Sequence, residues 1–140
     1  MVLPVFSQTI INSIDIAGNS YLTTSDIKNL MISRKDGTYK EEQFRTDLKT
    51  IRDKYKSLGF LYAKFTKEET DFGLDSAFVD IDLNIDEGNK VLIGEIDIRG
   101  NKAISKDQIL EQFETKIGDN LNDNILNSDI KELLVSYEKI

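Results

Sequence analysis

The side chains with the clearest potential for chemistry form a run of acidic and amide residues in the second half of the chain. They alternate with apolar residues and comprise Asp80, Asp82, Asn84 and Asp86. A calcium loop would need glycine at its sixth position and glutamate at its twelfth. Counted from Asp80, those positions hold Ile85 and Val91. Because acids two residues apart on a strand spread out instead of converging on one ion, we interpret the run as a solvated sheet face and predict no metal site.

Composition excludes many other reactions. The chain has no cysteine and no histidine, so thiolate nucleophiles, imidazole bases, disulfides and Cys/His zinc sites are impossible. Its net charge of −7 argues against a phosphate backbone as the main partner. No segment approaches the roughly 20 apolar residues that span a bilayer, and no glycine-rich phosphate loop occurs. We predict no catalytic residue, no enzyme activity, no cofactor and no nucleic-acid partner.

The chain contains the same unit twice. The hexapeptide IDIAGN at residues 14–19 returns as IDIRGN at residues 96–101, an offset of 82 residues (96 − 14 = 82). The same offset aligns further pairs, which are Leu22 with Ile104, Asp47 with Asp129, Ile51 with Leu133 and Tyr55 with Tyr137. A repeat this long is typical of tandem supersecondary units. On the same count the second unit would end near residue 170, so we expect it to be truncated.

Each copy of the hexapeptide predicts a strand, a Gly-Asn turn and a capped helix. Glycine supplies the positive φ that such a turn favours, and asparagine tolerates the same region. Ser105 and Gln108 then have the spacing of a capping box, with a weaker version at Thr23 and Asp26. We therefore expect helices to start directly after both turns.

The remaining pattern of the first unit predicts the order β-α-α-β-β. We expect strands at residues 10–16, 61–69 and 77–86, and a first helix at residues 23–33. A second helix should begin with a capping box at Thr38 and end at Gly59, with an apolar stripe formed by Phe44, Leu48, Ile51, Tyr55 and Leu58. Strict alternation over residues 77–86 indicates one buried and one wet face. The predicted fold class is α+β, a two-layer module in which two antiparallel helices cover one face of a three-stranded mixed sheet.

Together these motifs resemble the polypeptide-transport-associated (POTRA) domain. The features that carry the resemblance are the Ile-x-Ile-x-Gly-Asn corner, the capped helix, Asp47, Tyr55, the GFLYA segment at residues 59–63 and the closing Glu87-Gly88. The resemblance divides the chain into an irregular lead-in at residues 1–9, a complete module at 10–90 and the β-α-α part of a truncated second module at 91–140. Among tandem POTRA proteins it is most similar to the BamA-like barrel-assembly family.

The resemblance implies a role in outer-membrane protein assembly. POTRA modules of that family lie in the periplasm, dock accessory subunits and receive unfolded barrel precursors, and the full-length protein is embedded through a C-terminal β-barrel. We therefore expect protein partners and a location at the periplasmic face of the bacterial outer membrane. The alternative is a structural spacer or division-type interaction module that binds no client.

A partner-binding site follows from the same resemblance. In the family the second strand is a sheet edge, and an edge can accept an extended chain by β-augmentation. The candidate partner-binding residues are Leu61, Tyr62, Ala63, Lys64, Phe65, Thr66 and Lys67. Tyr62, Phe65, Ile51 and Tyr55 could begin a groove there. The alternative interpretation makes Phe44, Leu48, Ile51 and Tyr55 core residues, and lets the charges of the strand simply discourage nonspecific pairing.

The second unit should expose apolar helix faces. They comprise Ile109, Phe113, Leu126, Ile130, Leu133 and Leu134, and two strands would be needed to cover them. A patch of that size is more than monomers usually tolerate. We expect the chain to pair with another copy, exchange elements with it, or pack this half against the first.

Overall fold

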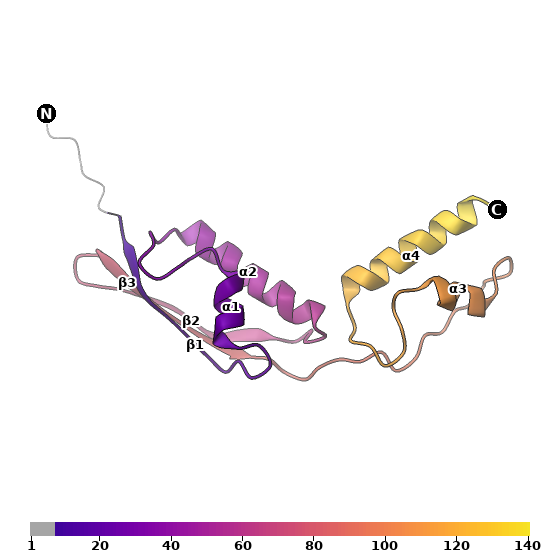
Figure 1. The fold of residues 1–140 in the computed structure, drawn as a ribbon, viewed down its shortest axis with the longest axis horizontal. Coiled ribbons are helices and arrows are strands. Elements are labelled where there is room, and N and C mark those ends of the chain that lie inside the picture. The colour runs from indigo at the N-terminus through magenta and orange to yellow at the C-terminus, as the bar shows by residue number, and fades with distance from the viewer. Residues whose placement is uncertain (1–7) are drawn as a thin grey trace, which may run out of the picture. The chain divides into compact units, whose positions relative to one another are not determined.

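The structure is a computed structural model that describes residues 8–140, so the expected lead-in at residues 1–9 lies almost wholly outside the described part. The elements follow in the order β1 (Ile10–Ala17), α1 (Thr24–Leu30), α2 (Glu41–Ser57), β2 (Lys64–Phe72), β3 (Phe78–Asp86), α3 (Lys106–Gln112) and α4 (Asp123–Glu138) (Figure 1). Contacts group the chain into two compact units. The first holds the described residues up to 54 with residues 62–88, and the second holds residues 55–61 and 89–140.

The first unit is built on a three-stranded mixed sheet, and its α+β class is as predicted. The strand order is β1-β3-β2, with β1 parallel and β2 antiparallel to the central β3. Helices α1 and α2 lie on one face of this sheet (Figure 1). The predicted alternation of β3 is confirmed, because its helix-facing side chains are fully buried or nearly so: Val79, Ile81, Leu83 and Ile85. The central strand therefore supplies the middle of the core.

A tight corner links β1 to α1. Gly18 has a φ of +80°, and a Cβ there would lie 2.1 Å from the carbonyl oxygen of Ile85, so only glycine fits. The carboxylate of Glu87 accepts hydrogen bonds from the backbone N–H groups of Ser20 and Tyr21, each at 2.9 Å. The end of β3 thus fixes the corner from the opposite side, which explains why Glu87 belongs to the motif.

The predicted helix starts are right for α1 and α3 and wrong for α2. Thr23 and Ser105 each cap their helix with a complete capping box. Thr38, in contrast, lies three residues before α2. It forms an isolated bridge with Ile10, and its hydroxyl donates to the side chain of Gln8 at 3.1 Å. The residue is needed to pair the loop with β1, and this tertiary role overrides the local capping pattern.

Helix α1 is shorter than predicted because a buried carboxylate draws the chain away from it. The prediction ran to Ser33, whereas the helix ends at Leu30. Asp47 on α2 is only 1% exposed, and its two oxygens accept from the N–H groups of Ile32 (2.6 Å) and Ser33 (2.9 Å). These amides point at α2 instead of continuing α1, so one side chain satisfies two donors of the loop and ties the helices together.

The second unit repeats this arrangement at the 82-residue offset. Asp129 on α4 is buried and accepts from the N–H groups of Glu114 and Thr115, both at 2.8 Å. The isolated bridge between Ile10 and Thr38 returns as Leu92 with Asn120. The repeat seen in the sequence therefore extends to individual backbone contacts.

The pKa of Asp129 reflects this environment. Burial by itself would raise the pKa of the carboxyl group, because it disfavours the charged form. Hydrogen bonds from the hydroxyl of Thr115 and from the two backbone N–H groups act in the opposite direction and prevail. The net effect is a pKa below the ordinary value of an aspartate, so Asp129 is a bound carboxylate at neutral pH.

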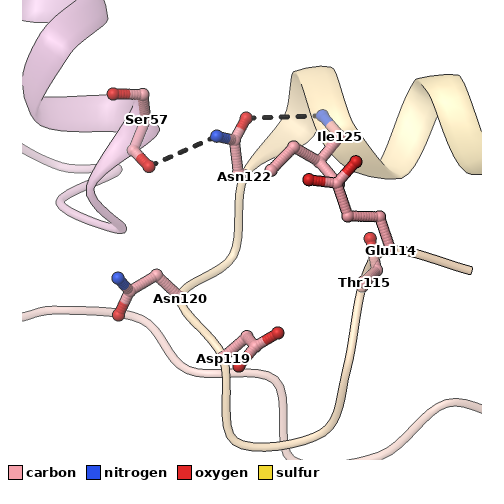
Figure 2. A pocket seen from close by; sticks show the side chains of 7 residues that line it. All are labelled: Ser57, Glu114, Thr115, Asp119, Asn120, Asn122 and Ile125. Atoms are coloured by element: carbon pink, nitrogen blue, oxygen red, sulfur yellow. Dashed lines mark hydrogen bonds between the residues drawn. The ribbon is translucent and has the colours of Figure 1, made fainter.

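The second unit has a polar hollow whose lining includes the hydrogen bonds that hold the start of α4. Asn122 caps α4 by accepting from the N–H group of Asn124 at 3.0 Å. It also accepts from the N–H of Ile125 (3.4 Å), and its amide donates to the carbonyl oxygen of Ser57 at 3.3 Å (Figure 2). The hollow, of about 220 Å³, is lined by Ser57, Glu114, Thr115, Asp119, Asn120, Asn122 and Ile125. The side-chain amide of Asn122 thus already holds the start of α4, and we assign the hollow no binding role.

The strand predicted from the second hexapeptide is absent. Residues 96–98 form no β-ladder, and the bridge at Leu92 is the isolated one described above. In the first unit the equivalent strand pairs with β3, and the described part of the second unit has no such partner. A strand needs a neighbour to bond its backbone groups, so the sequence pattern alone does not suffice.

The buried carboxylate of Asp47 makes a first prediction. Asp47→Asn keeps one acceptor but turns an N–H donor toward a backbone N–H, so we expect a loss of about 2 kcal/mol in unfolding free energy. Hydrogen exchange at the amides of Ile32 and Ser33 should accelerate accordingly. Asp53→Asn on the exposed side of the same helix is the control, expected to cost less than about 0.5 kcal/mol. Equal effects of the two substitutions would contradict the assignment.

Asp129 makes a second prediction, about acid. Because its pKa is lowered in the folded state, its contribution to stability is fully present above the unfolded value of about 3.9 and is lost as pH falls through the lower folded value. Amide exchange at Glu114 and Thr115, corrected for its intrinsic pH dependence, should report loosening below about pH 4. In Asp129→Asn this acid-dependent component should vanish; its persistence would mean that another group controls the loop.

Candidate partner-binding edge

The predicted binding residues are only partly on the edge strand. The strand order places β2 at an edge of the sheet, but β2 begins at Lys64. Leu61 and Tyr62 lie in a turn, and Ala63 after them has no regular structure. These three predicted residues therefore do not belong to the strand. The reason is local: Gly59 has a φ of +91°, and the chain needs the next residues to turn from the end of α2 into the sheet.

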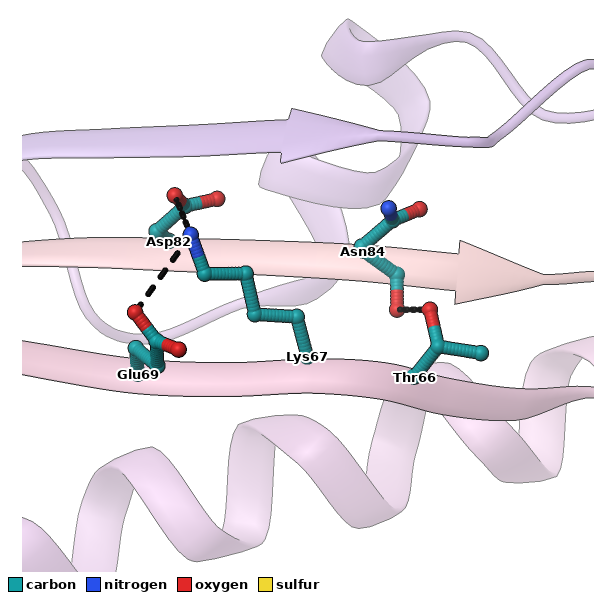
Figure 3. Close-up of polar contacts among 5 residues, drawn as sticks. All are labelled: Thr66, Lys67, Glu69, Asp82 and Asn84. Carbon is teal, nitrogen blue, oxygen red and sulfur yellow. Dashed lines mark hydrogen bonds and ion pairs between the residues drawn. The ribbon is translucent and has the colours of Figure 1, made fainter.

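A β-bulge interrupts the remaining predicted residues. Phe65 pairs with Ile85 and Lys67 pairs with Asn84, so Thr66 is an extra residue on β2. Its hydroxyl donates to the carbonyl oxygen of Asn84 at 3.3 Å (Figure 3). A bulge reverses the in-out alternation beyond it, which the sequence did not reveal. The regular part of the edge is therefore the stretch after Thr66.

The unpaired backbone groups of this stretch can be assigned from the hairpin. The N–H of Gly73 donates to the carbonyl oxygen of Phe78 at 3.0 Å, so residue 73 points its backbone toward β3. Backbone groups of an antiparallel strand alternate between its two neighbours. Glu68, Thr70 and Phe72 therefore direct their N–H and C=O groups outward. They form a row of donors and acceptors that an added strand would bond.

The opposite edge of the sheet is partly covered. The N–H of Ile11 donates to the carbonyl oxygen of Gly37 at 2.9 Å, and the N–H of Tyr39 donates to that of Thr9 at 2.8 Å. The loop between the helices thus pairs with the start of β1. No such backbone bond to the outer side of β2 occurs among the described residues, so β2 is the more accessible edge.

Side chains from α2 flank the helix-facing side of β2. The guanidinium carbon of Arg52 lies 4.8 Å from the ring centre of Phe65, and the same group donates to the carboxylate of Glu68. Ile51 and Tyr55, proposed as groove residues, are each 1% exposed. They line no groove, and the interpretation of the apolar stripe of α2 as core is correct.

The face of the sheet away from the helices carries the acidic run together with a lysine. The ammonium nitrogen of Lys67 lies 3.3 Å from a carboxylate oxygen of Glu69 and also donates to the carboxylate of Asp82 (Figure 3). These hydrogen bonds, chiefly the one with Asp82, raise the pKa of Lys67 above its ordinary value. The Asp80 carboxylate accepts from Ser13 Oγ (2.6 Å) and Asn12 Nδ2 (2.7 Å), and these bonds lower its pKa. Among the described residues no group of three or more acids could hold a metal ion.

None of the helices within residues 8–140 is long and apolar enough to cross a membrane.

Comparison with known proteins agrees with the fold. The family model described as "Surface antigen variable number repeat" (POTRA) matches residues 9–88 and again residues 91–140. Among curated proteins, the outer membrane protein assembly factor BamA of Nitratidesulfovibrio vulgaris is 29% identical over 110 residues. An outer membrane protein assembly factor of Treponema pallidum is 23% identical over 106 residues. These matches cover 78% and 76% of this chain but only 14% and 12% of the relatives.

Solved structures give the same result for the fold. POTRA domains 3–5 of Haemophilus influenzae BamA superpose with a TM-score of 0.68 at 19% identity, covering 92% of this chain and 54% of that one. POTRA domains 1–2 of Omp85 from Anabaena superpose with a TM-score of 0.52 at 20% identity, covering 94% and 79%. The family model spans most of the length of this chain. The chain therefore belongs to the POTRA family.

Proposed function

We propose that this chain is a periplasmic part of an outer-membrane protein assembly or translocation factor, where it binds unfolded barrel precursors and accessory subunits. The observation that carries the proposal is the free outer edge of β2, with the backbone groups of Glu68, Thr70 and Phe72 directed outward. The two curated relatives are named as outer membrane protein assembly factors, which supports a role in outer-membrane assembly.

β-Augmentation suits such a role because backbone hydrogen bonds depend on strand shape more than on sequence. Barrel precursors share extended, alternating segments and little else. A receptor that bonds their backbone can therefore accept many of them. The bulge at Thr66 and the charged side chains along β2 also limit pairing with arbitrary edges, which a receptor exposed to unfolded chains needs.

The contact that we propose lies further along the strand than the one predicted from the sequence. Of the residues predicted from the sequence, Lys64, Phe65, Thr66 and Lys67 remain on β2, and we place the main hydrogen-bonding stretch at residues 67–72 because it is the regular part. Leu61, Tyr62 and Ala63 would then contact a partner only at its end.

The test is a titration of the intact chain with a synthetic strand peptide from an outer-membrane barrel. We expect amide shifts along β2 and smaller ones along β1. Thr70→Pro should abolish the shifts, since it removes an outward N–H at an edge position where proline is tolerated and leaves the ladder to β3 intact. Loss of binding is expected to exceed tenfold, because the blocked position lies in the middle of the added strand.

Thr70→Val is the matched control, because it changes the side chain and keeps the N–H. It should bind like the unaltered chain. Unchanged β3 amide resonances in Thr70→Pro would verify that the sheet is intact. If the peptide shifts no β2 amide in the unaltered chain, the receptor role fails and the spacer interpretation gains.

We further propose that residues 91–140 correspond to the first part of the module at residues 10–90 and that this half mediates self-association. The support lies in equivalent positions of the two long helices. Leu48 on α2 is 5% exposed beneath the sheet, whereas Ile130, its equivalent on α4, is 43% exposed. Leu134 nearby is 60% exposed. Ile109 and Phe113, which we expected to be bare, are in fact buried.

Light scattering across a concentration series should therefore show dimers or larger species. A double variant, Ile130→Ser with Leu134→Ser, should shift the chain toward the monomer, because it removes apolar area from the exposed face. Ile32→Ser is the control, since Ile32 is exposed to a similar degree in the first unit. A strict monomer at every concentration, with α4 well ordered, would contradict self-association.

A further inference from the structure

The wet face of the sheet is acidic in rows that run to the β2 edge. In one row Asp15 on β1 is paired with Asp82 on β3, which is paired with Glu69 on β2. In the next row Asp80 on β3 is paired with Asp71 on β2. Like charges directly opposite each other on neighbouring strands repel. The edge therefore ends in two carboxylates that continue rows of negative charge.

Little positive charge compensates these rows. Lys67 is held between Glu69 and Asp82, and Lys64 lies 3.8 Å from Asp86 at the far end of the strand. Of the described residues, neither Asp15 nor Asp71 takes part in an ion pair within 4.0 Å. A strand added to β2 would place its own side chains at the end of each row, where Glu69 shares Lys67 with Asp82 and Asp71 has no ion-pair partner among the described residues.

We propose that the β2 edge selects extended segments that carry Lys or Arg at alternate positions on the wet face, opposite Glu69 and Asp71. The inference rests on the proposed function and specifies its ligand. An antiparallel strand bonded to the outward groups of Glu68, Thr70 and Phe72 would form its non-hydrogen-bonded pairs at residues 69 and 71. Side chains approach most closely in such pairs, so the two basic residues would meet the two carboxylates directly.

The other face of the same segment should be apolar. It would continue the helix-facing side of β2, where Phe65 lies under Arg52 and Phe72 packs edge-on against Tyr39 with ring centres 5.5 Å apart. Phe72 is 42% exposed, so it has area left to bury. The preferred ligand is thus an alternating strand, apolar on one face and basic on the other, and not merely any extended chain.

The test compares three synthetic peptides that share one apolar face and have lysine, threonine or glutamate at the alternate positions. Each is titrated into the intact chain, with β2 amide shifts as the readout. We expect the lysine peptide to bind about fivefold more tightly than the threonine peptide, and the glutamate peptide to bind least. The lysine preference should shrink as salt is added.

Variants locate the effect. Glu69→Gln with Asp71→Asn should bring the ratio of lysine-peptide to threonine-peptide affinity close to one. Glu42→Gln with Asp53→Asn, both on exposed positions of α2, removes the same net charge away from the edge and should retain the preference. Equal binding of the lysine and threonine peptides would overturn the charge selection but leave the strand receptor standing. If no peptide shifts β2, the proposed function itself fails.

Discussion

The structure depends on one repeated interaction, a buried carboxylate that accepts two backbone N–H groups from the loop between two helices. Asp47 forms it in the first unit and Asp129 in the second. Hydrogen bonds to a charged acceptor are stronger than neutral ones, and an unmet buried charge is expensive. The loop must therefore keep its course, which in turn fixes where the first helix ends and how the second helix is approached.

The same loop also reaches the sheet. Once the carboxylate sets residues 32 and 33, residues 36–39 lie against the start of β1 and bond its outer edge. The loop thus covers one edge of the sheet and leaves the other, β2, accessible. Which edge of the sheet stays accessible thus depends on a loop that a buried aspartate on a helix holds in place, well away from β2 itself.

Periodicity and repetition predicted the architecture well. The alternation at Val79, Ile81, Leu83 and Ile85 identified the buried face of β3, and the two capping boxes at Thr23 and Ser105 located helix starts. What failed depended on contacts distant in sequence. Thr38 has a local capping pattern but is used to pair with β1, and residues 96–98 have a strand pattern but no partner strand in the described part of the chain. The bulge at Thr66 has no sequence signal, so neither the start of β2 nor its regular stretch could be predicted from the sequence.

The parallel pairing of β1 with β3 has a consequence for the order of folding. Ile10 pairs with Phe78, so the sheet cannot close until most of the first unit has been synthesised, whereas the bonds to Asp47 span only 14 and 15 residues. Contacts between nearby residues form faster because they close shorter loops. The same pair of short-range bonds recurs at Asp129 in the second unit. We therefore expect the helix pair of the first unit, held by its buried carboxylate, to form before the sheet closes during synthesis.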